Sequence, residues 1–292
     1  MSAPTRARGR RALAPYLLVL PGGLWLAAFF LIPTVVMLSL SLQSGSIEEG
    51  FRLTWRFSTY TEAIELYHTQ LVRSLTYSGL VTVLALVIAY PVAYWIAFHG
   101  GSRKSSYLFL ILLPFFVSFV IRTVSWQFIL SDQGIVLAPL KSLGLLPEDF
   151  HLLATAAAVI GGLTYNFLPF MVLPLYVSLE RIDPSLAEAA SDLYASKAQG
   201  FLRVILPLSL PGVFAGVLLT FVPAAADFVN AAILGGPGTT MIGNVIQTEY
   251  LTNLDYPLAS ALSFTLMAAL LIGVFAYARA LGTEQVLEVG AG

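Results

Sequence analysis

Six long apolar segments restrict the fold of this chain more than any other feature. A transmembrane α-helix needs about 20 mostly apolar residues, and each of these segments is long enough to cross a bilayer. They run from Leu13 to Leu42, Val72 to Phe98, Tyr107 to Leu130, Leu153 to Leu179, Pro207 to Leu234 and Pro257 to Leu281. The sequence therefore predicts an all-α integral membrane protein with six transmembrane helices.

The composition supports the same class. Hydrophobic residues make up 58% of the 292 residues and charged residues 11%, against about 25% charged residues in ordinary soluble domains. The mean hydropathy is +0.82. A formal net charge of −1 provides no basic field for binding nucleic acid. The absence of cysteine excludes disulfides, thiolate nucleophiles and cysteine-ligated metals.

The first apolar segment could be taken for a secretory signal, because several arginines precede it. It continues beyond the usual length of a signal's apolar core and lacks a clear small-residue cleavage site. We therefore expect it to remain as a membrane helix. The predicted organisation is a tail of residues 1–12, a transmembrane domain of residues 13–281 and a tail of residues 282–292.

The distribution of Lys and Arg predicts the orientation, because six spans place both termini on one side of the membrane. That side carries Arg6, Arg8, Arg10, Arg11, Arg103, Lys104, Arg181, Lys197, Arg203 and Arg279. The opposite side carries only Arg52, Arg56, Arg73 and Lys141. Since cytoplasmic loops are enriched in Lys and Arg, we expect both termini and the loop between the fourth and fifth spans to be cytoplasmic.

A polar segment, residues 180–207, joins the fourth and fifth spans and has its own helix signals. Asp183 can cap backbone N–H groups, and Pro184 suits the first position of a helix. An apolar stripe at i, i+3, i+4 and i+7 follows, formed by Leu186, Ala189, Ala190 and Leu193. The opposite face carries Ser185, Glu188 and Asp192. This pattern predicts a short helix with one packing face and one displayed face.

The second half of the same loop predicts another short helix. Ser196 and Gln199 have the spacing of a capping box, and the helix leads through Arg203 to Leu206 and Pro207. These signals alone fit either a solvated amphipathic connector or an ordered surface for a partner protein.

Glu188-Ala189-Ala190, followed at a fixed spacing by Val204-Ile205-Leu206-Pro207, resembles the EAA loop of bacterial ABC importer permeases. In that family the loop is the coupling helix that docks on the cytoplasmic ATPase. The resemblance implies a docking set of Leu186, Glu188, Ala189, Ala190, Asp192, Leu193, Tyr194, Leu206 and Pro207. Two positions depart from the family pattern: Tyr194 stands where Gly is usual, and Val204 where Ile is commoner. Because Gly usually supplies φ > 0 in such a turn, the turn at Tyr194 is either built differently or strained.

A second resemblance concerns the third span and the segment before the sixth. Leu113-Pro114-Phe115-Phe116 through Trp126, followed by Gly134-Ile135, is similar to the first permease subunit of spermidine/putrescine-type transporters. Gly235-Gly236 with Ile242 to Ile246 also resembles that group. The resemblance implies the type I ABC importer permease fold (MetI-like), with transport of a polyamine, or of another small solute such as an opine, amino acid or sugar.

The same resemblance implies the partners and location of the chain. These are a second permease subunit, two cytoplasmic ATPase subunits and an extracytoplasmic solute-binding protein, in the inner membrane of a bacterium and in contact with its lipids. The chain contains no Walker sequence for ATP, so ATP hydrolysis is expected on a partner chain and no cofactor is expected here. Arg122 would then belong to a shared architectural pair or a gate.

Charged residues inside the spans mark a possible solute pathway, because a charge in the membrane needs a partner or a water-filled cavity. Measured along straight helices, Arg122 in the third span and Asp227 in the fifth lie at similar depth in the outer half. They could pair with each other, or Asp227, close to Pro223, could face the pathway and attract a cation. A third possibility is exposure near the outer surface.

Other polar and aromatic residues in the spans complete the predicted pathway: Trp126, Tyr165, Asn166, Phe228 and Asn230. Tyr165 and Asn166 follow Gly161-Gly162, which favours close helix approach. Tyr and Trp can also surround an ammonium group with their π faces. The three histidines, His68, His99 and His151, have no spacing for a metal site, and none is expected.

The segments on the opposite side are predicted to be loops. Residues 43–71 suggest a loop with a short interfacial helix, and Gly235-Gly-Pro-Gly238 suggests a tight turn. Two readings from other classes remain: a membrane-embedded enzyme using Arg122, Tyr165 and Asp227, or a scaffold or sensor that transports nothing.

Overall fold

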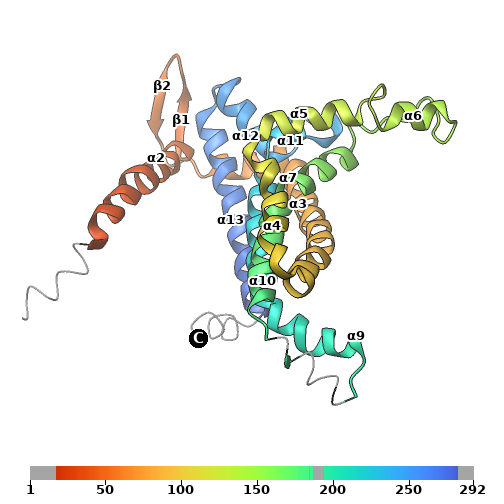
Figure 1. Ribbon diagram of the computed structural model, residues 1–292. Helices are drawn as coiled ribbons and strands as arrows, with labels where there is room; N and C mark the ends of the chain where they lie inside the picture. The colour runs from red at the N-terminus through yellow and green to blue at the C-terminus, as the bar shows by residue number, and fades with distance from the viewer. Residues whose placement is uncertain (1–17, 184, 187–191, 193, 282–292) are drawn as a thin grey trace, which may run out of the picture.

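The computed structural model describes residues 18–183, 185–186, 192 and 194–281 (Figure 1). Five helices of this part are long and apolar enough to cross a membrane, and a sharply bent pair can provide a sixth crossing. The predicted all-α membrane architecture is therefore confirmed. The first of these helices, Leu18–Ser41, contains a π-helical turn η1 (Ala27–Leu31) and α2 (Ile32–Ser41). It stands away from the others (Figure 1).

Three helices form the centre of the bundle: α3 (Ser58–His99), α7 (Ala156–Glu180) and α10 (Leu206–Ala225). Fully buried alanines on α3, at positions 85, 89 and 93, pack in one core cluster with Met171 and Leu175 of α7. Alanines four residues apart share one face of a helix and let two helix backbones come close. The last span, α13 (Tyr256–Leu281), lies beside these helices and within one residue of its predicted start (Figure 1).

Glycine allows α10 to approach α7 closely. A Cβ atom added at Gly212 would lie 2.5 Å from Ser178 Cβ and 2.7 Å from the carbonyl oxygen of Pro174. One added at Gly216 would lie 2.6 Å from Met171 Sδ. The two glycines, four residues apart, thus form the small-residue contact typical of membrane helices. Because α7 and α10 flank the loop of residues 180–207, this contact fixes how the two arms of the loop leave the bundle.

The third span differs from the straight helix predicted for Tyr107 to Leu130. It consists of η2 (Gly101–Arg103), α4 (Lys104–Leu112), η3 (Leu113–Phe116) and α5 (Phe119–Leu130), with a bend of 90° before α5. Pro114 lies in η3, and Val117 and Ser118 have extended ψ angles of 139° and 137° that end the first helical stretch. The depth estimated for Arg122 along a straight helix was therefore wrong.

The fifth span also ends earlier than the predicted Leu234. Helix α10 stops at Ala225, and α11 (Val229–Leu234) starts separately after Asp227. The segment then passes through η5 (Pro237–Thr239), where the predicted Gly-Gly-Pro-Gly turn is found, and α12 (Ile242–Leu251) before reaching α13. The break at Ala226 to Phe228 places a carboxylate where helical hydrogen bonding is interrupted.

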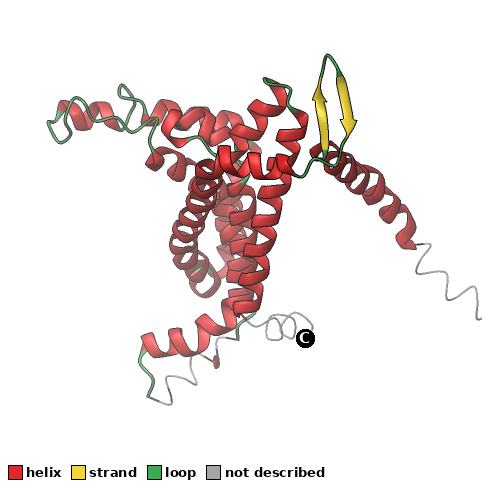
Figure 2. Ribbon diagram, turned by 180° about the vertical axis from the view of Figure 1, so that it is seen from behind, coloured by secondary structure: helices red, strands yellow, loops and turns green. Residues whose placement is uncertain are grey.

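At one end of the bundle, a β-hairpin stands above the first helix (Figures 1 and 2). Its strands, β1 (Gln43–Ser46) and β2 (Gly50–Leu53), pair antiparallel with Gln43 opposite Leu53. The prediction of a loop for residues 43–71 missed this hairpin. The predicted helix is present, but it is the start of α3 at Ser58, which continues into the second span through a kink at Tyr67.

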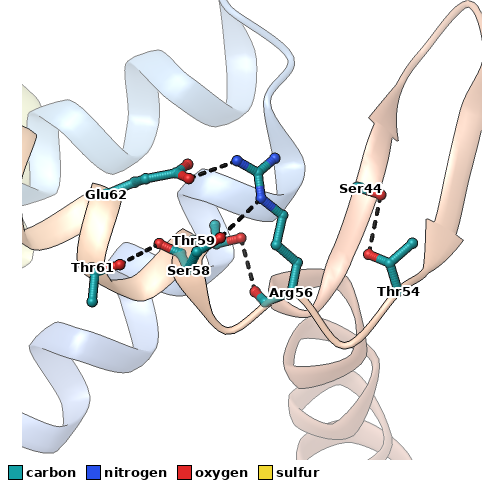
Figure 3. A network of polar contacts seen from close by, with 7 residues as sticks. All are labelled: Ser44, Thr54, Arg56, Ser58, Thr59, Thr61 and Glu62. Carbon is teal, nitrogen blue, oxygen red and sulfur yellow. Dashed lines mark hydrogen bonds and ion pairs between the residues drawn. The ribbon is translucent and has the colours of Figure 1, made fainter.

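Polar contacts fix the base of the hairpin against the start of α3 (Figure 3). Thr54 Oγ1 donates to Ser44 Oγ at 3.1 Å, and Arg56 pairs with Glu62 at 2.6 Å and donates to Ser58 Oγ at 3.1 Å. Near the same end, α6 (Leu137–Ser142) follows α5 on a projecting arm (Figure 1). The hairpin, α5, α6, α11 and α12 therefore share one end of the molecule.

The opposite end carries α9 (Lys197–Gly200), which continues through the π-helical turn η4 (Phe201–Ile205) into α10 (Figure 1). Both π turns of the described chain, η1 and η4, end two residues before a proline, Pro33 and Pro207. Proline has no N–H and crowds the carbonyl four residues before it. A widened turn ahead of proline relieves that crowding, so the helix stays continuous.

Candidate functional site

A buried polar cluster joins α5, α7 and α11, with Asn230 at its centre. Asn230 is fully buried, and its Oδ1 accepts hydrogen bonds from Asn166 Nδ2 at 2.9 Å and Thr123 Oγ1 at 3.3 Å. Asn166 also donates to Thr123 Oγ1 at 3.2 Å. The predicted residues Asn166 and Asn230 are thus brought together from distant parts of the sequence. Thr123 was not predicted, although it lies in the same apolar run as Arg122.

Asp227 completes this cluster from the break between α10 and α11. Its carboxylate accepts from the backbone N–H of Asn230 at 2.8 Å and from Asn230 Nδ2 at 3.2 Å. A carboxylate near the first turn of a helix accepts its free N–H groups and suits its positive end. Asp227 therefore places a buried carboxyl group at the edge of the cluster, with 8% of its surface exposed.

Arg122 lies in the first turn of α5, and its guanidinium packs on aromatic rings. Its Cζ atom is 4.7 Å from the ring centre of Phe115 and 5.7 Å from that of Phe119. Arg122 is buried, and among the described residues its Nε has no hydrogen-bond partner and it makes no ion pair with Asp227. The alternative in which Arg122 pairs with Asp227 is therefore wrong for this conformation, and neither side chain is surface-exposed.

Two predicted aromatic residues meet beside the cluster. Trp126 of α5 and Tyr165 of α7 pack edge to face, with ring centres 5.2 Å apart. The adjacent Asn166 is buried, and its Oδ1 has no hydrogen-bond partner within the part of the chain that the structure describes. An aromatic pair next to a free carbonyl acceptor can hold an ammonium group.

Glycine gives α7 and α11 room to meet at this cluster. A Cβ atom on Gly162 would overlap Leu234 and lie 3.1 Å from Asn230 Oδ1, whereas one on Gly161 would have nothing within 4 Å. Close helix approach is thus confirmed for Gly162 only.

The predicted Phe228 lies on a different face. It lines an apolar groove of about 950 Å³ between α2, α10, α12 and α13, and 42% of its surface is exposed. Tyr250 and Met37 line the same groove. Phe228 is therefore not part of the cluster around Asn230, even though it follows Asp227 directly.

The loop of residues 180–207 begins as predicted at Asp183. Its Oδ1 accepts from the backbone N–H of Ser185 at 2.9 Å, and this hydrogen bond lowers the pKa of the carboxyl. Leu186 and Asp192 are exposed. The predicted docking residues Glu188, Ala189, Ala190 and Leu193 lie outside the described residues, as does Pro184.

Tyr194 adopts a left-handed backbone conformation, which glycine, the usual residue at this position in the family pattern, adopts easily. Its φ is +58°, and 97% of its surface is exposed. Of the two alternatives, the structure has the strained turn, since a non-glycine residue at this φ costs about 1 kcal/mol or more. The predicted capping box follows directly and is confirmed, because Ser196 Oγ accepts from the backbone of Gln199 and Gln199 Oε1 from that of Ser196.

A cavity of about 610 Å³ lies behind this loop, between α7 and α10. Leu186, Arg181 and Asp183 line it together with Pro174 and Gly212 of the close helix contact. Leu206 and Pro207, which belong to the predicted docking set, start α10 beside it. Within the described residues, no group of three or more His, Cys, Asp or Glu side chains could hold a metal ion.

The sequence of this chain is similar to those of known transport proteins. The family model "Binding-protein-dependent transport system inner membrane component" matches residues 85–281. The chain is 39% identical over 259 residues to the spermidine/putrescine transport system permease protein PotB of Haemophilus influenzae, covering 88% of this chain and 90% of that protein.

Solved structures share the fold. A chain of a bacterial ABC transporter involved in the import of the acidic polysaccharide alginate matches 93% of this chain and 96% of its own length, with a TM-score of 0.76 and 20% identity. A chain of a bacterial alginate ABC transporter in complex with an alginate pentasaccharide-bound periplasmic protein matches 91% of this chain and 93% of its own length, with a TM-score of 0.73 and 20% identity. The predicted ABC importer permease fold is confirmed. The chain belongs to the family of inner membrane components of binding-protein-dependent transport systems.

Proposed function

We propose that this chain is a permease subunit of an ATP-binding cassette importer that carries a polyamine, such as spermidine or putrescine, into the cytoplasm. The observation that carries the proposal is the similarity over almost the whole chain to PotB, which is named as a spermidine/putrescine permease. The chain itself performs no covalent chemistry, and ATP is hydrolysed on a separate subunit.

The buried polar cluster supports a pathway for a cationic solute. Asp227 supplies a negative charge, and the neighbouring Trp126 and Tyr165 supply π faces that favour ammonium groups. Asn166 Oδ1 is an additional acceptor. We assign Arg122, held on Phe115 and Phe119, to the wall or gate of this pathway, since its charge would repel a bound cation.

The exposure of the first helix supports a second permease subunit as a partner. None of the most apolar stretch of Leu18–Ser41 is buried in this chain, and the groove that contains Phe228 opens between α2 and α13. A membrane-spanning partner would cover both surfaces, which are otherwise left to lipid. Phe228 would then contact the second permease subunit and the solute at their shared boundary.

The loop of residues 180–207 is the proposed docking site for the ATPase subunits. Its exposed face, its capped α9 and its direct connection to α10 suit an element that receives movement from another protein. With the loop and both termini in the cytoplasm, as the Lys and Arg distribution predicts, the hairpin and α6 face the solute-binding protein. The alginate transporter complex, in which a chain shares this fold, contains such a periplasmic protein, which supports a solute-binding protein as a partner.

Competition for uptake tests the substrate. The chain is reconstituted in proteoliposomes with its second permease, ATPase and solute-binding protein, and uptake of labelled spermidine is measured with ATP inside. Unlabelled putrescine should compete, whereas an opine, an amino acid and a sugar should not. Competition by one of these three but not by putrescine would replace the polyamine with that solute class.

A further inference from the structure

The helix that leaves the cytoplasmic loop continues without interruption into the membrane. Residues Lys197–Ala225 form one helix of 29 residues, in which α9, η4 and α10 follow each other directly. Its N-terminus is fixed by the capping box of Ser196 and Gln199. A force applied to the loop would therefore reach α10 along a continuous helix and not through an irregular connection.

The aromatic side chain of Phe201, at the start of the π turn, packs this helix against α3. The ring of Phe201 packs edge to face on Tyr90, at 5.6 Å between ring centres, and on Tyr94, at 6.0 Å. Edge-to-face pairs at this spacing add to the burial energy of the rings. Phe201 thus lies on two successive turns of α3.

A hydrogen bond reinforces the same contact about two turns further along the helix from Phe201. The hydroxyl of Tyr90 and Oγ of Ser209 are 2.8 Å apart, and Ser209 is fully buried. Ile205 is buried in the cluster that holds Ala93 and Ala97 of α3. The contact between η4–α10 and α3 therefore has an aromatic, an aliphatic and a polar part.

Helix α3 lacks one backbone hydrogen bond beside this contact. Pro91 lies inside it, directly after Tyr90, and cannot donate the backbone hydrogen bond to Val87. Prolines of this kind are common sites of kinking in helices. The end of α3 beyond Pro91, which carries Tyr94, can therefore change direction relative to the rest.

We propose that Phe201, with the Tyr90–Ser209 hydrogen bond, makes α3 move with α10 when the cytoplasmic loop is displaced. Phe201 is then a positioning residue for transport: it touches neither ATP nor solute, but it passes the movement of the loop to a second membrane helix. The proposal rests on the proposed function, since it assumes an ATPase docked on the loop.

The first test measures ATP hydrolysis and solute uptake in the same proteoliposomes. Phe201→Ala should still assemble and hydrolyse ATP, but the solute transported per ATP should fall by roughly fivefold or more, because two aromatic contacts are lost. Phe201→Tyr should keep most of this ratio. Leu219→Ala is the matched control, because Leu219 lies on α10 outside the docking loop, with 49% of its surface exposed, and should leave the ratio unchanged.

An unchanged ratio in Phe201→Ala would overturn the proposal. A failure of the proposed function looks different, because the unmodified complex would then show no ATP-dependent uptake at all. Tyr90→Phe offers a milder variant, since it keeps the ring and removes only the hydroxyl that meets Ser209.

The second test does not depend on how well Phe201→Ala assembles. Because the chain contains no cysteine, Tyr90→Cys and Ser209→Cys can be combined and joined with a short, reducible thiol cross-linker. If α3 and α10 move together here, cross-linking should leave uptake near its uncross-linked level. Loss of uptake on cross-linking, with recovery on reduction, would show that the two helices move past each other and would contradict the proposal.

Discussion

Tyr194 is the residue at which the loop departs from its family pattern and at which the backbone is strained. A φ of +58° already strains the backbone at Tyr194, and a second heavy atom on Cβ would add to that strain. We predict that Tyr194→Val weakens binding of the ATPase by roughly fivefold, as measured by titrating the purified ATPase onto the permease. Tyr194→Gly removes the strain and should bind at least as well. Equal affinities for the two variants would show that this backbone conformation is irrelevant to docking.

Asp227 combines a structural hydrogen bond with a charge, and one substitution separates the two. Asp227→Asn keeps an oxygen for the backbone N–H of Asn230 and loses the negative charge. We predict a fall in the uptake of a cationic solute by roughly tenfold, with normal amounts of folded protein in the membrane. Undiminished uptake would remove Asp227 from the pathway.

A substitution at Asn230 tests the structural part of the same cluster. Asn230→Ala leaves Asn166 and Thr123 without their shared acceptor and should lower the thermal stability of the purified protein by an amount equivalent to about 2–4 kcal/mol. We thus expect Asn230→Ala to lower the stability of the protein and Asp227→Asn to lower the uptake of solute.

Among the helices, the α7–α10 contact makes the clearest prediction. Gly212→Ala would force Cβ against Ser178 and the carbonyl of Pro174, so we expect destabilisation of about 1–3 kcal/mol. Gly273→Ala in α13 is the matched control, because its added Cβ has nothing within 4 Å. Thermal unfolding in detergent compares the two, and an equal effect at both positions would contradict the packing described here.

The helices also show what the sequence can predict and what it cannot. Spans such as α7 and α13 were predicted to within three residues at their starts, because apolar length is a local property. The 90° bend before α5 was missed, since Pro114 can kink a helix or end it and hydropathy does not record direction. The hairpin of residues 43–53 was missed because it lacks a clear alternation of apolar and polar residues.

For the candidate site as well, the sequence predicted individual residues but not how they contact each other. Asn166, Asn230 and Asp227 were found because polar groups in apolar runs stand out. Their mutual contacts, and the failure of Arg122 to meet Asp227, depend on the bend in the third span and the break in the fifth. Thr123 was overlooked because threonine in a membrane helix can satisfy its hydroxyl on the preceding turn, as it also does here with Phe119 at 3.1 Å.

At the scale of the whole molecule, the proposed transport function requires a docked ATPase at the end opposite the hairpin. Glu188 belongs to the predicted docking set and lies outside the described residues. We predict that Glu188→Lys copurifies poorly with the ATPase and abolishes uptake, because a charge reversal at a docking surface repels its complement. Glu48→Lys at the turn of the hairpin reverses an exposed charge at the other end of the molecule and should leave ATPase binding unchanged. Coupled uptake by the Glu188 variant at the normal rate would refute its role.

The most direct test of the central claim is ATP-dependent uptake of labelled spermidine by the reconstituted complex, with and without the ATPase subunit. We predict that spermidine accumulates only when both permeases, the ATPase, the solute-binding protein and ATP inside the vesicles are present. We also predict that this chain alone changes no substrate chemically. Uptake or turnover by this chain without the ATPase, or no uptake by the complete complex, would contradict the proposed role as an importer permease.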